Sequence, residues 1–234
     1  MSELDIKQII EDAALHLGKV VRYPKYYNKT TRYSEQEIKQ SFVLKFYENL
    51  KTNELEDKYY LTFETPTKYA YAFHLKDKDV DKQPECDPDR TKPNFQSGQI
   101  DVSIWGNDSS GTAYSHIEFK HIPRTDNKAP ENRKKITKDL LKLSMEESNS
   151  GINYFVFVIK HDNETWNGLK VLLFDRKNYK TKEPKSIYET VSEKLDENHQ
   201  IKIIIIDREN GDIIGRPFDY KETLNHPDDF KMND

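Results

Sequence analysis

Residues 98–121 read Gly-Gln-Ile-Asp-Val-Ser-Ile-Trp-Gly-Asn-Asp-Ser-Ser-Gly-Thr-Ala-Tyr-Ser-His-Ile-Glu-Phe-Lys-His, and this stretch decides the fold. Two segments within it, 99–105 and 115–121, alternate apolar and polar side chains, as a strand does when one face is buried. The polar run between them predicts a hairpin connection. If the hairpin closes symmetrically, Trp105 pairs with His116 across the two strands.

This register places charged side chains together on one face of the hairpin. Asp101 faces Lys120, and Glu118 lies diagonally from Asp101, about 7–8 Å away. A register slip by one residue would bury Asp101, so the hydrophobic pattern resists it, whereas a slip by two keeps the face. Two carboxylates this close raise the pKa of one of them unless a cation joins them. Magnesium prefers such hard oxygen ligands. The pattern therefore indicates a candidate magnesium site, with Lys120 placed to orient an attacking water. His116 shares the Glu118 face, and at a strand end it is expected to be satisfied by solvent.

The elements around the hairpin include both helices and strands. Apolar residues at helical spacing predict a helix over 2–17 that stops at Gly18. The capping box Ser34-Glu-Gln-Glu37 opens a second helix, and Ala129-Pro130 opens a third that runs to about residue 147. The other predictions are strands over 59–64, 69–75, 154–159, 169–174 and 201–206, a long loop over 76–97, a helix over 186–195 and a hairpin turn at Asn210-Gly211. This order predicts an α/β fold with a mixed central β-sheet flanked by helices.

The length suits one main domain. The chain has 234 residues, which fits one domain or one domain with an appendage. We expect an N-terminal helix with an aromatic and basic connector over 1–33. The α/β domain is expected over 34–216, and a polar, loosely held tail over 217–234.

Composition excludes several classes of protein. The chain has 37 Lys and Arg against 41 Asp and Glu, a net charge of −4, which excludes a protein that coats nucleic acid by charge alone. The single cysteine, Cys86, excludes an internal disulfide and a cysteine-rich zinc site, and it fits a reducing, cytoplasmic location. No signal peptide is expected at the N-terminus. No run approaches the roughly 18 apolar residues of a membrane span.

The segments Gly98-Gln-Ile-Asp101 and Ile117-Glu-Phe-Lys120 resemble the core signature of the PD-(D/E)XK nuclease superfamily, whose core is restriction-endonuclease-like. In that superfamily an acidic residue on one core strand is followed by Glu-x-Lys on the next, with a helix before and another after. The resemblance spans about 34–159. It departs from the pattern at Ile100, which stands where the name-giving proline would be. It implies a magnesium-dependent enzyme that hydrolyses phosphodiester bonds.

The roles of the motif residues follow from the resemblance by position. It implies that Asp101 and Glu118 are metal ligands, that the main-chain carbonyl of Phe119 is a further ligand, and that Lys120 is the catalytic lysine. The implied cofactor is Mg²⁺, with Mn²⁺ as an expected substitute.

Two predicted helices contribute further candidates. Glu35 resembles the helix glutamate of the superfamily, and Glu37 is its rival, although a capping role gives a simpler account of Glu37. On the third helix, Lys135, Lys138 and Lys142 lie three and four residues apart and share one face. They are candidates for binding nucleic-acid phosphates, with Lys138 as the first choice. The alternative is a solvated face balanced by neighbouring acidic residues.

The leading hypothesis is a magnesium-dependent endonuclease that cleaves nucleic acid, with DNA as the expected substrate. It would act in restriction or antiviral defence, as a homodimer or with a larger partner protein, and away from membranes. One alternative is a catalytically inactive binding or structural subunit with the same fold. A weaker one is a glycoside hydrolase that uses a carboxylate pair, in which Lys120 has no clear role. The simplest alternative treats Asp101 and Lys120 as an exposed ion pair worth about 0–1 kcal/mol, with Glu118 in solvent.

Overall fold

The computed structural model of the chain describes residues 4–22, 33–72, 85–87, 96–108, 110–122, 130–160, 191, 193–214 and 217–225. Among these residues, no helix combines the length and the apolar character that crossing a membrane would require. The predicted strand over 169–174 lies outside the described residues, as do most of the predicted helix over 186–195 and the connector over 23–32.

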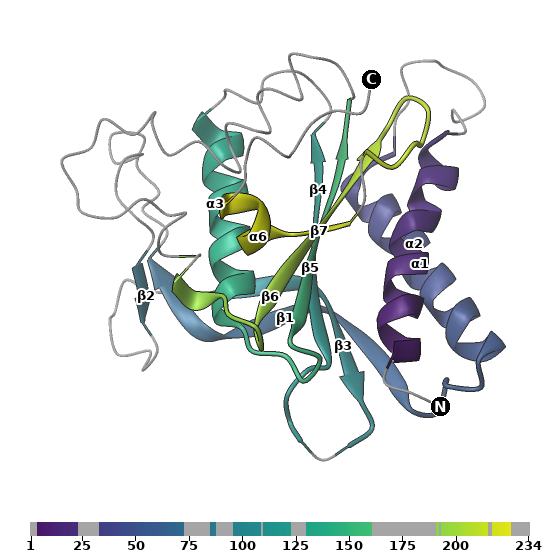
Figure 1. The fold of residues 1–234 in the computed structure, drawn as a ribbon, viewed down its shortest axis with the longest axis horizontal. Coiled ribbons are helices and arrows are strands. Elements are labelled where there is room, and N and C mark those ends of the chain that lie inside the picture. The colour runs from purple at the N-terminus through teal and green to yellow at the C-terminus, as the bar shows by residue number, and fades with distance from the viewer. Residues whose placement is uncertain are drawn as a thin grey trace.

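A single sheet runs through the described part of the molecule (Figure 1). Its strand order is β2-β1-β3-β4-β5-β6-β7. The pairs β4–β5 and β5–β6 are parallel, and the other pairs are antiparallel. The strands are β1 (Tyr59–Ala72), β2 (Glu85–Asp87), β3 (Gln96–Gly106), β4 (Ser115–Ile122), β5 (Ile152–Ile159), β6 (Gln200–Asp207) and β7 (Phe218–Asp219). The predicted α/β class with a mixed sheet is confirmed.

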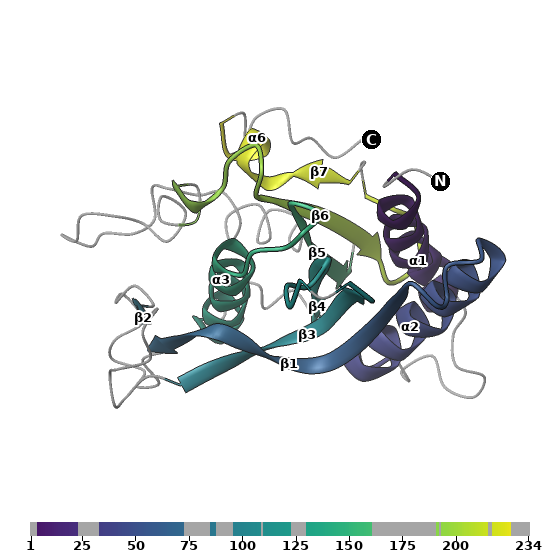
Figure 2. The same cartoon turned by 90° about the horizontal axis from the view of Figure 1, so that it is seen from below.

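Helices cover both faces of this sheet. Figure 2 shows α1 (Leu4–Arg22) and α2 (Glu35–Thr52) on one side, and α3 (Pro130–Met145) with the short α6 (Tyr220–Asn225) on the other. Each face therefore has its own hydrophobic cluster. Helix α1 packs on the same cluster as α2.

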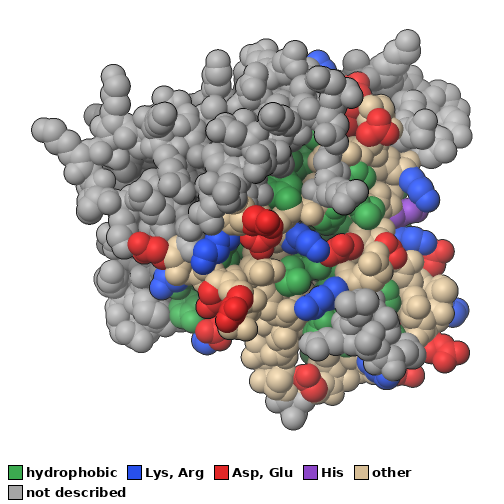
Figure 3. Space-filling model, in the orientation of Figure 1, with side chains coloured by type: hydrophobic (Ala, Val, Ile, Leu, Met, Phe, Trp, Pro, Cys, Tyr) green, Lys and Arg blue, Asp and Glu red, His purple; other side chains and the backbone are tan. Residues whose placement is uncertain are grey.

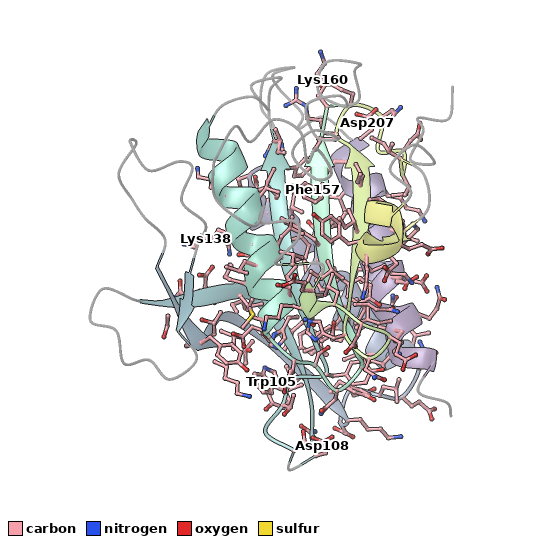
Figure 4. All side chains as sticks on the ribbon, turned by 60° about the vertical axis from the view of Figure 1, so that its left-hand side comes forward. Trp105, Asp108, Lys138, Phe157, Lys160 and Asp207 are labelled. Atoms are coloured by element: carbon pink, nitrogen blue, oxygen red, sulfur yellow. The ribbon has the colours of Figure 1, made fainter. Side chains whose placement is uncertain are left out.

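The predicted central strand is confirmed as β5. Its side chains alternate between the two clusters: Phe155 and Phe157 pack on the α3 side, and Val156 and Val158 on the side of α1 and α2. Phe157 lies in the layer between α3 and the sheet (Figure 4). Because both faces of β5 are covered, the strand has a continuous apolar sequence.

The predicted helix stop at Gly18 is wrong. Helix α1 continues through Gly18 to Arg22. The glycine has a packing role instead, because a Cβ at this position would lie 2.2 Å from the main-chain oxygen of Gly211. Gly18 therefore lets the backbone of α1 come close to the turn after β6.

The two strands predicted around Pro66 form one strand, β1. Its register with β3 shifts between Pro66 and Ala70, so the proline marks an irregularity rather than an end. Within the predicted loop over 76–97, residues 85–87 form β2 on the outer side of β1, and β3 begins at Gln96.

The predicted loose tail is wrong for residues 217–225. Strand β7 pairs with β6, and the Tyr220 side chain that follows it is fully buried in the cluster beneath α3. Isolated aromatic residues in a polar sequence give no periodic signal, so the sequence did not reveal this packing. The hairpin turn is confirmed: Gly211 has a φ of 78°, and the Ile214 N–H donates to the Ile205 oxygen at 2.9 Å.

Candidate functional site

Strands β3 and β4 pair in a register two residues away from the predicted one. Ser103 lies opposite His116, where a symmetric hairpin would place Trp105. On the other side of β3, the Trp105 ring stacks on Tyr60 and its indole N–H donates to Thr62 at 2.8 Å. Trp105 is therefore held by β1. A shift of two residues leaves the alternation of the strand unchanged.

The regular pairing of β3 with β4 ends just before Asp101. The last pair is Val102 opposite Ile117, and continuing this register would set Asp101 opposite Glu118 rather than diagonal to it. In place of a further backbone pair, the Phe119 N–H donates to Asp101 Oδ2 at 2.8 Å. The Asp101 carboxylate thus takes the place of a main-chain carbonyl as the hydrogen-bond acceptor for this N–H.

The side-chain alternation of β3 also changes at Asp101. Val102 packs in the cluster beneath α1 and α2, but Ile100 packs in the cluster beneath α3. On β1, Glu64 has a left-handed backbone conformation (φ 51°) between the residues that pair with Ile100 and Val102. The strands turn at this irregularity. As a result Asp101 contacts α2, whereas Glu118 and Lys120 pair with side chains of α3. The two carboxylates stay close enough for the charge of Asp101 to help raise the pKa of Glu118.

A buried lysine of α2 is the ion-pair partner of Asp101. Lys39 Nζ lies 2.5 Å from Asp101 Oδ1 and 3.8 Å from carboxylate oxygens of Glu35 and Glu64. Burial by itself would lower the pKa of Lys39, but the hydrogen bond with Asp101 and the surrounding negative charges raise it. One ammonium group therefore ties α2, β1 and β3 together at this point.

Glu118 on β4 is buried, with 1% of its surface exposed. Its Oε1 accepts a hydrogen bond from Lys142 of α3, and the same ammonium donates to the Gln99 carbonyl at 2.6 Å. Gly98 leaves room for the stem of this lysine, because a Cβ there would lie 2.9 Å from Lys142 Cδ. The exposed ion pair offered as the simplest alternative is therefore wrong, since Glu118 is not in solvent.

Asp139 on α3 contacts two ammonium groups. Its Oδ1 lies 2.9 Å from Lys142 Nζ, and its Oδ2 lies 2.7 Å from Lys120 Nζ. Burial would raise the pKa of Asp139, but the two lysines outweigh it and lower that pKa. Burial and the charge of Asp139 raise the pKa of Glu118 well above its ordinary value, and Lys142 offsets this only in part. Acid–base sites typically shift the pKa values of two carboxyl groups in opposite directions in this way.

The start of α2 separates the roles of the two rival glutamates. The predicted capping box is confirmed: the Ser34 N–H donates to Glu37 at 2.8 Å, and the Glu37 N–H donates to Ser34 Oγ at 3.3 Å. Glu35 instead reaches β4, where its Oε2 accepts the His121 N–H at 3.2 Å. Of the two, Glu35 is the one beside the motif strand.

The three lysines predicted to share a face of α3 differ in exposure. Lys135 is exposed, Lys138 is half-buried, and Lys142 is buried against the sheet. Figure 4 shows Lys138 on the side of α3 away from Phe157. Lys135 and Lys138 therefore remain surface candidates, whereas Lys142 contacts Glu118. In Figure 3, acidic and basic side chains are interspersed over the described part of the molecular face that this view shows.

His116 is buried, not solvent-exposed as expected. Its ring Nδ1 lies 2.9 Å from Ser103 Oγ, and its backbone N–H donates to Asn153 Oδ1 at 3.0 Å. Burial lowers the pKa of His116 to about 4. The expectation failed because β5 covers the far edge of β4, so the first residues of β4 are interior positions.

The oxygen donors at this junction suit a divalent cation chemically, but each already has a partner. The carboxylate of Asp101 is paired with Lys39, and that of Glu118 with Lys142. Within the part of the chain that the structure describes, no three His, Cys, Asp or Glu side chains are grouped so as to hold a metal ion. The donor types fit magnesium, and binding it would require these ion pairs to open.

Two charged residues of this junction carried signals that the sequence reasoning did not use. Lys39 precedes Phe42 by three positions and Phe46 by seven, so it lies on the buried stripe of α2. A lysine on such a stripe needs a buried anionic partner. Asp139 precedes Lys142 by three positions, the spacing of an ion pair along a helix.

No model of a protein family and no curated protein matches the chain.

Proposed function

We propose that this protein is a magnesium-dependent phosphodiesterase, an endonuclease that cleaves nucleic acid, with DNA as the expected substrate. The observation that carries the proposal is the meeting of three elements where β3 and β4 stop pairing. Asp101 bonds the backbone beside Glu118, and Glu35 of α2 bonds the backbone beside Lys120. Helix α2 precedes these strands and α3 follows them, the order that the resemblance to PD-(D/E)XK nucleases implies.

The residues divide the chemistry between them. Asp101, Glu118 and the carbonyl of Phe119 would hold magnesium, which when bound neutralises phosphate charge and lowers the pKa of a water. Burial would lower the pKa of Lys120, but the charges of Asp139 and Glu35 raise it. Lys120 is therefore a cation and hydrogen-bond donor beside the reacting phosphate rather than a general base.

The substrate must be bound without help from net charge, because the chain carries −4. Lys135 and Lys138 on α3 are the described candidates for phosphate contacts. A second copy or a larger partner protein would extend such a limited basic surface. Restriction or antiviral defence is the biological setting that we propose.

The test is magnesium-dependent nicking of supercoiled plasmid DNA by the full chain. We expect Glu118→Gln and Lys120→Met to lower the rate by at least about 10²-fold, the loss typical of removing one charge-stabilising group. Lys51→Met removes a charge from the exposed last turn of α2 and should cut like the parent. Circular dichroism checks that each variant is folded. If Glu118→Gln and Lys120→Met both cut at the parent rate, the assignment is wrong.

A non-catalytic binding or structural module is the second candidate. The pairing of both candidate ligands with lysines favours it, because ion pairs of this kind hold a fold together without a metal. Titration calorimetry with Mg²⁺ and Mn²⁺ separates the two proposals. A folded parent chain that binds neither ion and cuts no DNA supports the module.

A further inference from the structure

Four charged groups form ion pairs around Glu118. Glu118 and Asp139 supply two carboxylates, and Lys120 and Lys142 supply two ammonium groups. Lys142 lies between the two acids, and its side chain is 5% exposed. A divalent cation held at Glu118 would place excess positive charge beside the Lys142 ammonium, where little water is present to screen it.

Lys142 can relieve this excess charge by moving its ammonium. Its Nζ has three partners: Glu118, Asp139 Oδ1 at 2.9 Å and the Gln99 carbonyl at 2.6 Å. Leaving Glu118 would still let it keep the other two. Its stem packs closely against Gly98, where a Cβ would lie 2.9 Å from Lys142 Cδ. Lys142 is thus a cation on a flexible stem, placed directly on a candidate metal ligand.

We propose that Lys142 is an internal counter-ion that competes with the divalent cation for Glu118, so that metal binding requires its ammonium to leave that carboxylate. The proposal rests on the proposed function, because it takes Glu118 as a metal ligand. Lys142 then holds the metal-free site together and sets the cation concentration at which the site is filled. Lys39 at Asp101 is a weaker competitor, because Asp101 is 14% exposed and water screens that pair.

The test is cation binding by the full chain without nucleic acid. Lys142→Met removes the ammonium and keeps most of the stem volume. We expect it to bind Mn²⁺ at least about tenfold more tightly than the parent in titration calorimetry, because a buried like charge is removed. Lys142→Arg keeps the charge and should bind no more tightly than the parent. Lys51→Met, which removes an exposed charge on α2, should match the parent.

A thermal measurement gives a second readout. Magnesium should raise the unfolding midpoint of Lys142→Met more than that of the parent, because the ion replaces the lost ammonium. If Lys142→Met does not fold in metal-free buffer, Lys142→Gln takes its place, since its amide remains a hydrogen-bond donor. Folding of either variant on addition of Mn²⁺ supports the proposal. Failure of both to fold with or without Mn²⁺ overturns it.

The outcomes separate this proposal from the proposed nuclease activity. A parent that binds metal and cuts DNA, with no gain in affinity for Lys142→Met, overturns the competition alone. A gain in affinity without cleavage by the parent supports the competition and overturns the nuclease assignment. Absence of both binding and cleavage in parent and variant overturns both.

Discussion

The two edges of strand β4 are built differently. Toward β5, six consecutive residues from Ile117 to Ile122 pair in register with a parallel strand whose side chains are buried on both faces. Toward β3, regular pairing covers three residue pairs, after which the Asp101 carboxylate accepts the Phe119 N–H. Backbone groups released from a ladder need other partners. On the β5 side the partners of β4 are apolar residues, whereas on the β3 side a charged side chain, Asp101, takes over as the partner.

The largest effect is expected on the apolar edge. Phe157 is fully buried, and its ring centroid lies 4.2 Å from that of Phe155. Phe157→Ala should lower the free energy of unfolding by about 3–5 kcal/mol, the usual cost of such a cavity. Urea denaturation measures the change. The control Leu44→Ala alters a side chain that is 74% exposed and should stay within about 0.5 kcal/mol of the parent.

The next prediction concerns the pH dependence of stability, through His116 on the side of β4 that pairs with β3. The pKa of His116 is lowered to about 4 from an ordinary value of 6.5, so the unfolded chain takes up a proton at a higher pH than the folded chain. The contribution of His116 to stability is complete above about pH 6.5 and is lost as the pH falls towards 4. The shift corresponds to about 3 kcal/mol.

His116→Gln should remove this acid-dependent loss. The measurement is the free energy of unfolding at pH 7 and at pH 4.5 for the parent and the variant. Carboxylates also titrate in this range, so the informative quantity is the difference between the two pH dependences. Identical pH dependences would show that the His116 ring is not buried as described.

The smallest of the three effects concerns the ion pair at Asp101. Lys39→Met should lower the free energy of unfolding by about 2 kcal/mol, less than for a fully buried pair because Asp101 keeps some contact with water. The control is Lys45→Met, whose partner Glu48 lies 3.0 Å away on the outer side of the same helix and which should cost under about 1 kcal/mol. If both variants lose the same free energy of unfolding, the ion pair between Lys39 and Asp101 contributes no more than an ordinary surface ion pair.

The comparison also shows what the sequence could reveal. Alternation predicted the strands over 99–105 and 115–121, which are present in β3 and β4, and an apolar run predicted β5. Alternation reports local burial and is therefore readable in a single segment. The register of β3 with β4 was not readable, because a shift of two residues leaves the alternation of apolar and polar side chains unchanged.

The charged side chains show the same limit. The sequence singled out Asp101, Glu118 and Lys120, and the structure brings each of them to the junction of β3 and β4. The sequence did not reveal that Asp101 would contact α2, because this contact follows from the left-handed backbone of Glu64 on a neighbouring strand. The partner Lys39 was missed for the same reason, since its role appears only when α2 is packed on the sheet.

The close approach of Gly18 to the Gly211 oxygen has a consequence for the order in which the molecule is completed. These two positions lie near opposite ends of the sequence, so α1 is synthesised long before the turn against which it packs. The helix cannot reach its final place until that turn exists. Contacts between such distant segments slow folding. Until they form, the apolar stripe of α1 is exposed on the growing chain and can aggregate.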